Sequence, residues 1–220
     1  MDDSNISQLP AINSFCATRG YQQEMLEESL AKNVIIALDT GSGKTHIAIL
    51  RMKIEVEREV KKVITRSPQY YCGHLPLTLL HQVSWFLSPT VLLCAQQKRV
   101  ISDALPVSVG LISGALEPTQ WKDPALWKGV LEKHRVMVTT PQVLLDALRH
   151  GYVSLGTDIS LLVFDEAHHA VDNHPYNCIM KEFYYNLPSR IPGYPDSYRP
   201  AVLGLTASPI YGGHVDSAFR

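Results

Sequence analysis

A glycine-rich stretch near the start of the chain has the residue types of a phosphate-binding loop. Its eight residues are Leu38, Asp39, Thr40, Gly41, Ser42, Gly43, Lys44 and Thr45. Gly41 and Gly43 would let the backbone take positive φ and bring its N–H groups close to phosphate oxygens. The Lys44 ammonium would bind the β and γ phosphates of a nucleoside triphosphate, and the Thr45 hydroxyl would bind Mg²⁺. A turn that only joins a strand to a helix would not require glycine, lysine and threonine in series.

Two adjacent carboxylates follow an apolar run in the second half of the chain. Residues 161–164 are Leu, Leu, Val and Phe, and Asp165 and Glu166 come next. This order places both carboxylates at the carboxyl end of a buried strand, where open α/β sheets bind their ligands. Asp165 is suited to hold Mg²⁺ and Glu166 to deprotonate the attacking water, so with Lys44 they are the expected catalytic residues. Alone, the pair would fit an acidic helix N-cap equally well; with the loop, it predicts a triphosphate site.

These motifs require strands that end where the loop and the carboxylates begin. Apolar runs predict strands at residues 34–38, 84–87, 107–112, 136–139, 161–164 and 201–205. Helical spacing predicts helices at 22–32 and from 45 to about 61. The second helix is expected to have a solvated face formed by Glu55, Arg58, Glu59 and Lys62. Strands that alternate with helices predict a three-layer α/β fold, in which helices cover both faces of a parallel sheet.

Length and composition fit one such domain. The 220 residues are 45% hydrophobic and 19% charged, which is ordinary for a globular chain, and residues 1–18 are expected to form a loose segment before it. The net charge of -1 argues against a polycation that coats nucleic acid. The cysteines show no C-x-x-C spacing, so neither zinc nor a disulfide framework is expected. With no leader and no membrane span, we expect an intracellular protein of the cytoplasm or nucleus.

Short motifs follow one another in a fixed order along nearly the whole chain. They lie at residues 21–22, 40–45, 89–90, 139–142, 165–168 and 206–208. This order resembles the first motor lobe of superfamily 2 helicases, which implies a RecA-like P-loop NTPase fold over residues 19–220. Leu38 departs from the glycine that usually opens the loop pattern, a change that helicase loops tolerate better than kinases or GTPases do. Residues 19–26, 92–97 and 164–171 are most similar to the amino-terminal helicase region of fungal Dicer-like proteins, especially the second class.

The resemblance implies roles for residues at matching positions. Gln22 would contact the adenine edge and so select ATP, with Arg19 and Tyr21 beside the base. The residues expected to couple the ATP site to the RNA path are His168, Thr206 and Ser208. Short polar groups and backbone N–H donors would contact the sugar-phosphate backbone without sequence preference. The residues expected to do so are Pro89, Thr90, Ser113, Gly114, Thr139 and Thr140.

The implied function is that of an ATP- and Mg²⁺-binding lobe of an RNA helicase, which acts in RNA silencing and antiviral defence with double-stranded RNA as its partner. Such motors hydrolyse ATP between two lobes, and the second lobe supplies arginines that stabilise the charge on the transferring phosphoryl group. No second lobe is found in the 220 residues, so weak hydrolysis is expected. The alternatives are a non-catalytic nucleotide-binding or partner-interaction module and a P-loop ATPase unrelated to nucleic acid.

Two polar or irregular segments have competing interpretations. His168, His169 and His174 with Asp172 match no standard zinc pattern, so His169 and His174 are expected to be polar surface or local hydrogen-bonding residues. Residues 188–200 are rich in proline and predict a surface loop, with a partner-docking site as the alternative.

Residues 63–82 interrupt the resemblance. In the family, the helix after the phosphate loop passes through a short basic turn into the strand that ends in Pro-Thr, here residues 85–90. The extra residues show neither helical nor alternating periodicity and predict a long loop inside a compact domain. A retained intron would explain them, because valine codons begin with GT and Gln82 can be encoded by CAG, the usual intron end. The alternative is a genuine surface insertion near the RNA side that tunes partner choice.

Overall fold

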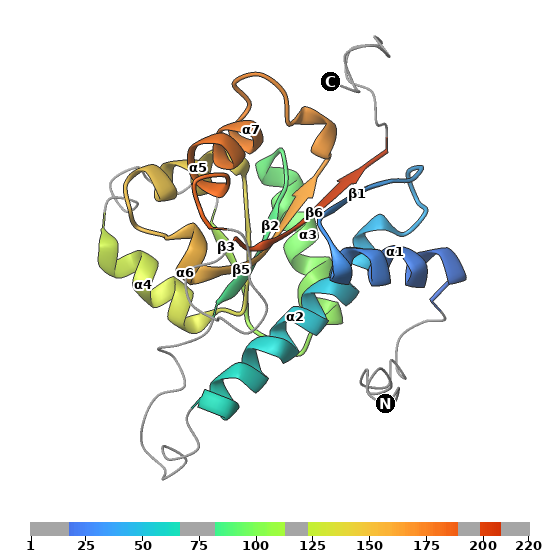
Figure 1. Cartoon of the computed structure of the whole chain (residues 1–220), viewed down its shortest axis with the longest axis horizontal. Helices are drawn as coiled ribbons and strands as arrows, with labels where there is room; N and C mark the ends of the chain where they lie inside the picture. Colours follow the sequence, from blue (N-terminus) through green and yellow to red (C-terminus); the bar gives the residue numbers. More distant parts are fainter. Residues whose placement is uncertain (1–17, 67–81, 113–122, 189–198, 208–220) are drawn as a thin grey trace, which may run out of the picture.

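The computed structural model describes residues 18–66, 82–112, 123–188 and 199–207. Within these ranges six strands form one all-parallel sheet in the order β1-β6-β5-β2-β4-β3 (Figure 1). The strands are β1 (Val34–Ala37), β2 (Val83–Leu87), β3 (Val109–Ile112), β4 (Val136–Thr139), β5 (Ile159–Asp165) and β6 (Ala201–Thr206). Each strand predicted from the sequence is present, and the largest shifts are two residues, at the start of β3 and of β5.

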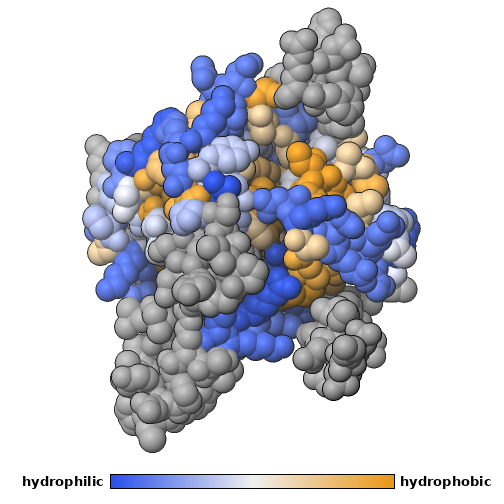
Figure 2. Space-filling model, viewed as in Figure 1, coloured by the Kyte–Doolittle hydropathy of each residue, from blue (hydrophilic) through white to orange (hydrophobic). Residues whose placement is uncertain are grey.

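Helices connect the parallel strands. They are α1 (Gly20–Ala31), α2 (Lys44–Arg66), α3 (Val91–Ala104), α4 (Pro124–Lys133), α5 (Pro141–Arg149), α6 (Leu155–Asp158), η3 (Ala167–His169), α7 (Pro175–Ile179) and η4 (Met180–Tyr184). In the described part of the chain, no helix is long and apolar enough to cross a bilayer. Figure 2 shows hydrophilic residues over most of the coloured surface on one face, with apolar residues in smaller areas between them.

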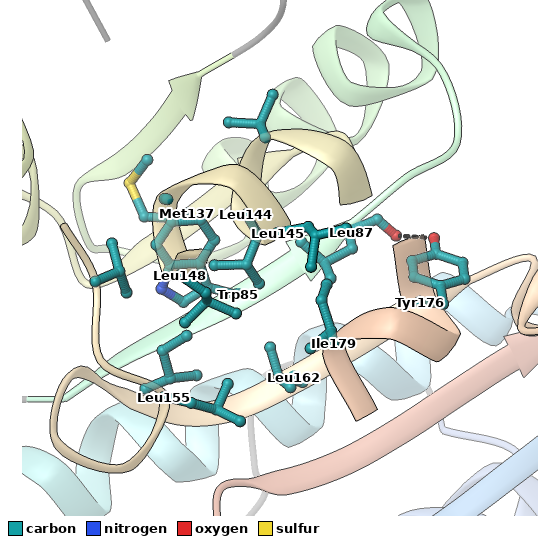
Figure 3. Close-up of a cluster of buried hydrophobic side chains, with 14 of the residues drawn as sticks. Trp85, Leu87, Met137, Leu144, Leu145, Leu148, Leu155, Leu162, Tyr176 and Ile179 are labelled. Carbon is teal, nitrogen blue, oxygen red and sulfur yellow. Dashed lines mark hydrogen bonds between the residues drawn. The ribbon is translucent and has the colours of Figure 1, made fainter. Parts of the chain in front are cut away.

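The sheet is buried on both faces. All five residues of β2 are buried, and alternate side chains enter different clusters. Phe86 packs with residues of α1, α2 and α3 on one face. Trp85 and Leu87 pack with residues of α4, α5, α6 and α7 on the other face, as the close-up in Figure 3 shows for several of them. This arrangement confirms the predicted three-layer α/β fold.

The helix α2 differs from its prediction in length and in burial. It ends at Arg66 rather than near residue 61, and Pro68 two residues later disfavours further helix. The solvated face predicted for it is wrong at two carboxylates, because Glu55 is 0% and Glu59 3% exposed. Both are paired within the helix: Arg51 Nη1 lies 2.6 Å from Glu55 Oε2, and Lys62 bonds to Glu59. The i, i+3 and i, i+4 spacing of such pairs is the same on an exposed face, so the sequence pattern could not distinguish the two.

Parts of several sequence predictions lie outside the described residues. These are residues 1–17 of the expected amino-terminal segment, residues 67–81 of the extra stretch and residues 189–198 of the proline-rich segment. The first four residues of the extra stretch continue α2, and its last residue is held in the fold. The Gln82 backbone N–H donates to Glu59 Oε2 at 3.2 Å, and its side-chain amide donates to the Gly156 carbonyl at 2.9 Å.

Candidate nucleotide-binding site

The glycine-rich loop joins the carboxyl end of β1 to the first turn of α2. Gly41 and Gly43 have φ of 81° and 90°, a region that side chains disfavour and glycine adopts freely. The Leu38 N–H donates to the Thr206 carbonyl at 3.1 Å, so the start of the loop is anchored to the end of β6. Because α2 begins at Lys44, its unpaired first-turn N–H groups open toward the loop. Such a terminus attracts anions.

Lys44 and Ser42 carry the polar side chains of the loop that lie nearest the start of α2. Lys44 Nζ donates to the carbonyls of Leu38 at 2.5 Å and Asp39 at 2.9 Å, which keeps the ammonium above its own loop. The buried Ser42 hydroxyl has no hydrogen-bond partner within the described residues. Thr45 lies half-buried in the first turn of α2. Positive-φ glycines, an ammonium and hydroxyls around one loop fit a nucleoside triphosphate with its Mg²⁺.

Residues before α1 and in its first turn brace the loop. Ser42 presents its carbonyl to two donors, the Tyr21 hydroxyl at 2.6 Å and Gln22 Nε2 at 3.1 Å. Gln22 Oε1 in turn accepts the Arg19 backbone N–H at 3.0 Å, and Arg19 Nη1 lies 3.4 Å from the Tyr21 hydroxyl. A Cβ at Gly43 would approach Gln22 Nε2 to 2.4 Å, so this brace needs glycine there. The three residues expected near an adenine base therefore lie together beside the loop.

Asp165 and Glu166 stand at the end of β5, as predicted. Asp165 Oδ2 accepts a hydrogen bond from Ser88 Oγ at 3.1 Å. Burial raises the pKa of the Asp165 carboxyl and the Glu166 charge adds to this, whereas the Ser88 bond and the Lys44 charge oppose it. Glu166 has φ 51° and ψ 51°, the left-handed region, which is strained for a side chain of this size. Backbone strain of this kind clusters at functional sites.

His168 joins the carboxylates to β6. Its Nδ1 lies 2.9 Å from Thr206 Oγ1 and 3.3 Å from Glu166 Oε2. Thr206 is buried at the end of β6, next to the anchor of the glycine-rich loop. Two of the three residues expected to couple the site to RNA are therefore in contact with each other, and the third, Ser208, lies outside the described residues.

The residues expected to contact RNA follow β2 and β4 at the same edge of the sheet. Thr90 is exposed and caps α3, where its hydroxyl accepts the Leu93 N–H at 3.2 Å. Pro89 and Thr140 are half-buried, and Thr140 precedes α5. Thr139 is fully buried, and its hydroxyl lies 3.4 Å from the Thr140 carbonyl, so its side chain has no surface for a ligand. Two further residues of this set, Ser113 and Gly114, lie outside the described ranges.

Tyr176 and Ser88 contact Asp165 but were not identified from the sequence. The buried Tyr176 hydroxyl lies 2.7 Å from the Asp165 carbonyl and 2.9 Å from the Leu87 carbonyl. Burial raises the pKa of Tyr176, so this hydroxyl keeps its proton. Pro175 marks the start of α7 in the sequence, but no local pattern indicates that the next side chain reaches two strand ends.

His169 and His174 lie close together after the acidic motif. His174 Nδ1 accepts the Tyr176 backbone N–H at 3.3 Å, which confirms the local hydrogen-bonding role predicted for it. The His169 ring stacks on the His174 ring at 5.6 Å between centroids. Burial lowers the pKa of both imidazoles. The residues that the structure describes contain no group of three or more potential ligands placed to hold a metal ion.

Comparison with known proteins agrees with this geometry. The family model of the DEAD/DEAH box helicases matches residues 19–212. The chain is 44% identical over 203 residues to Dicer-like protein 2 of Cryphonectria parasitica and 47% identical over 192 residues to Dicer-like protein 2 of Coccidioides immitis (strain RS). These alignments cover 92% and 87% of this chain but 12% of each relative. The Pyrococcus furiosus Hef helicase domain superimposes with a TM-score of 0.61 at 28% identity, over 89% of this chain and 34% of that one.

Proposed function

The chain belongs to the DEAD/DEAH box helicase family, and on this premise we propose that it is the ATP- and Mg²⁺-binding first lobe of an RNA helicase of the Dicer-like type. The observation that carries the proposal is the meeting of three motifs at one edge of the sheet. The Lys44 loop, the Asp165 carboxylate and the pair formed by His168 and Thr206 lie at the carboxyl ends of three adjacent strands, β1, β5 and β6. Ligands of open parallel sheets bind at this edge.

Each site residue has a distinct role in this proposal. Free backbone N–H groups of the glycine-rich loop and of the first turn of α2, together with the Lys44 ammonium, bind the triphosphate. Thr45 and Asp165 hold Mg²⁺, which would neutralise charge on the phosphate oxygens. Glu166 orients the attacking water and accepts its proton. His168 stands within contact distance of both Glu166 and Thr206, and this position suits it to link the state of the ATP site to β6.

Further residues of the lobe would contact the adenine base and RNA. Arg19, Tyr21 and Gln22 would select ATP through its base. Pro89, Thr90 and Thr140 would contact the backbone of an RNA duplex through groups that carry no base specificity. The similarity to proteins named Dicer-like protein 2 supports the Dicer-like type. We propose on this basis a role in RNA silencing and antiviral defence inside the cell, in the cytoplasm or nucleus. The chain spans 12% of the length of each of these relatives.

The domain proposal assigns residues 19–220 to this lobe and treats residues 63–82 as a stretch that the nucleotide site does not need. A complete motor would also require a second lobe, because ATP is hydrolysed between two lobes and arginines of the second lobe stabilise the charge on the transferring phosphoryl group. A protein made of these 220 residues alone is therefore expected to bind ATP and Mg²⁺ but to hydrolyse ATP slowly.

Replacement of the proposed base tests the function. Glu166→Gln keeps shape and hydrogen-bonding capacity but cannot accept a proton, so ATP binding should persist while hydrolysis falls by about a hundredfold or more. Glu132→Gln, on the surface helix α4, is the matched control and should change neither ATP binding nor the rate of hydrolysis. Phosphate release by highly pure protein measures the rate, and calorimetric titration measures binding. Equal rates for wild type and Glu166→Gln would overturn the proposed role of Glu166.

A further inference from the structure

The ends of β2 and β5 are tied together by one side chain. The Tyr176 hydroxyl lies 2.9 Å from the carbonyl of Leu87, the last residue of β2, and 2.7 Å from the carbonyl of Asp165, the last residue of β5. Figure 3 shows the bond to Leu87 from a side chain that comes in from α7. The single hydroxyl proton is shared between these two carbonyls, so the hydroxyl ties the end of β2 to the end of β5.

Packing around the Tyr176 ring holds that hydroxyl in place. The ring stacks on Phe164, with centroids 4.6 Å apart and planes 18° apart, and it is 0% exposed. The backbone N–H of Tyr176 donates to His174 Nδ1 at the start of α7. A ring fixed by packing on one side and by its helix on the other loses little further entropy when it makes hydrogen bonds.

A second group holds the Asp165 side chain. Ser88, the residue after β2, is fully buried and donates from Oγ to Asp165 Oδ2 at 3.1 Å. Ser88 is itself fixed, because its N–H donates to the Thr139 carbonyl at 3.1 Å and its carbonyl accepts the Cys94 thiol at 3.5 Å. Tyr176 thus holds Asp165 through its backbone carbonyl, and Ser88 holds it through its carboxylate. Neither residue belongs to the acidic motif.

From this geometry we infer that Tyr176 and Ser88 are positioning residues that aim the Asp165 carboxylate at Mg²⁺. The inference rests on the proposed function, in which Asp165 is a magnesium ligand. Groups that hold a metal ligand set its direction and basicity, and their loss typically weakens metal binding about 10- to 100-fold. Tyr176 also fixes the residue that precedes the strained Glu166, so both acidic side chains depend on this contact.

A purely structural role is the competing explanation, and Tyr184 provides a matched control. Tyr184 is also buried, and its hydroxyl accepts a hydrogen bond from Asn33 Nδ2 at 2.6 Å, at the opposite end of the sheet, where β1 begins. If Tyr176 only stabilised the fold, Tyr176→Phe and Tyr184→Phe would act alike on nucleotide binding. If Tyr176 positions Asp165, only Tyr176→Phe would change the effect of Mg²⁺.

The test measures binding of a non-hydrolysable ATP analogue, with Mg²⁺ and with EDTA, for wild type, Tyr176→Phe, Ser88→Ala and Tyr184→Phe. The gain in affinity for the analogue on adding Mg²⁺ should fall about tenfold in Tyr176→Phe and in Ser88→Ala. Their affinity in EDTA should stay within about twofold of wild type, since the phosphate loop is untouched, and Tyr184→Phe should keep the full gain. Thermal melting of each variant confirms that it is folded.

The possible outcomes separate this inference from the function on which it rests. An undiminished Mg²⁺ gain in Tyr176→Phe and Ser88→Ala, with wild type binding normally, would overturn the inference alone. If Tyr176→Phe does not fold, Tyr176 is a structural residue and its positioning role is overturned. Ser88→Ala would then still test the positioning role of Ser88. Failure of wild type to bind the analogue would overturn both the proposed function and the inference.

Discussion

Gly43 lies where the proposed phosphate loop packs against Gln22, one of the proposed adenine contacts. Its φ of 90° disfavours any side chain, and a Cβ there would stand 2.4 Å from Gln22 Nε2. Gln22 Nε2 would have to move to make room, which would disturb its bond to the Ser42 carbonyl. Both the backbone conformation of Gly43 and its close contact with Gln22 therefore disfavour any side chain at this position.

Gly43→Ala should accordingly lose ATP binding while the protein stays folded. Left-handed strain of about 1–3 kcal/mol and the displaced Gln22 both disturb the loop, and the core is not touched. Gly129→Ala is the control: this glycine lies in α4 with open space around it, and alanine should stabilise the helix by about 0.5–1 kcal/mol. Calorimetric titration and chemical denaturation measure the two effects. Unchanged affinity in Gly43→Ala would contradict the account of the loop.

Sequence patterns predicted where the candidate site residues lie but not which residues hold them. The positions of Lys44 at the start of a helix and of Asp165 at the end of a strand could be predicted because each lies in a short motif beside an apolar run. Ser88 and Tyr176 could not, because their contacts with Asp165 span 77 and 11 positions and depend on which strands are neighbours in the sheet. Strand order is set by packing and leaves no mark on the local sequence.

Among the elements, α2 begins at Lys44, which is proposed to bind phosphate, and also carries an ionic cluster formed by Arg51, Glu55 and Arg58. Arg51 is 1% exposed, bonds to Glu55 and donates from Nε to the Ser29 carbonyl at 3.3 Å, which ties α2 to α1. A carboxylate in such a position is stable only while it is paired. The cluster therefore makes the helix that carries Lys44 dependent on α1.

Glu55→Gln should destabilise the fold strongly. Removing one charge of a buried pair leaves the other in a medium of low polarity, and the expected loss in free energy of unfolding is about 3 kcal/mol. Glu28→Gln is the control, because its pair with Lys32 is solvent-exposed and worth about 1 kcal/mol or less. Urea denaturation measures both variants. A smaller loss in Glu55→Gln than in Glu28→Gln would contradict the burial of the pair.

The extra stretch can be tested as an element of its own. The hydrogen bond from Gln82 to Glu59 brings the start of β2 beside the last turns of α2, so a short link can replace what lies between. Deletion of residues 67–81, closed by a short glycine and serine link, should leave the melting temperature and ATP affinity close to wild type. Loss of ATP binding would contradict the proposal that the site does not need this stretch. Sequencing transcripts across the junction separates the two origins, since cDNA that always retains the stretch would rule out an intron.

At the scale of the whole molecule, the sequence predicted the three-layer fold because buried parallel strands leave continuous apolar runs that are easy to recognise. It did not predict the burial of Glu55 and Glu59, since i, i+3 and i, i+4 pairs look alike on either face of a helix. The assembled lobe places the candidate ATP residues and the candidate RNA residues on one edge of the sheet, around the ends of β1, β6, β5, β2 and β4. A partner lobe that closed on this edge would reach both.

The rate of hydrolysis tests this view of the lobe. If hydrolysis needs the proposed contacts from a second lobe, the turnover of these 220 residues on their own should lie far below the roughly 10 per second typical of complete enzymes. Steady-state phosphate release, with and without duplex RNA, measures it. A rate near that typical value would contradict the claim that a second lobe is needed.

Titration of wild type and Lys44→Ala with ATP and Mg²⁺ tests directly whether this loop binds a nucleotide. The ammonium would make charge-assisted contacts worth about 1.5–3 kcal/mol, so we expect Lys44→Ala to bind ATP at least about tenfold more weakly than wild type. Lys128→Ala, which alters an exposed lysine of α4, should bind like wild type. Equal affinity of wild type and Lys44→Ala for ATP would contradict the assignment of this loop as a nucleotide site.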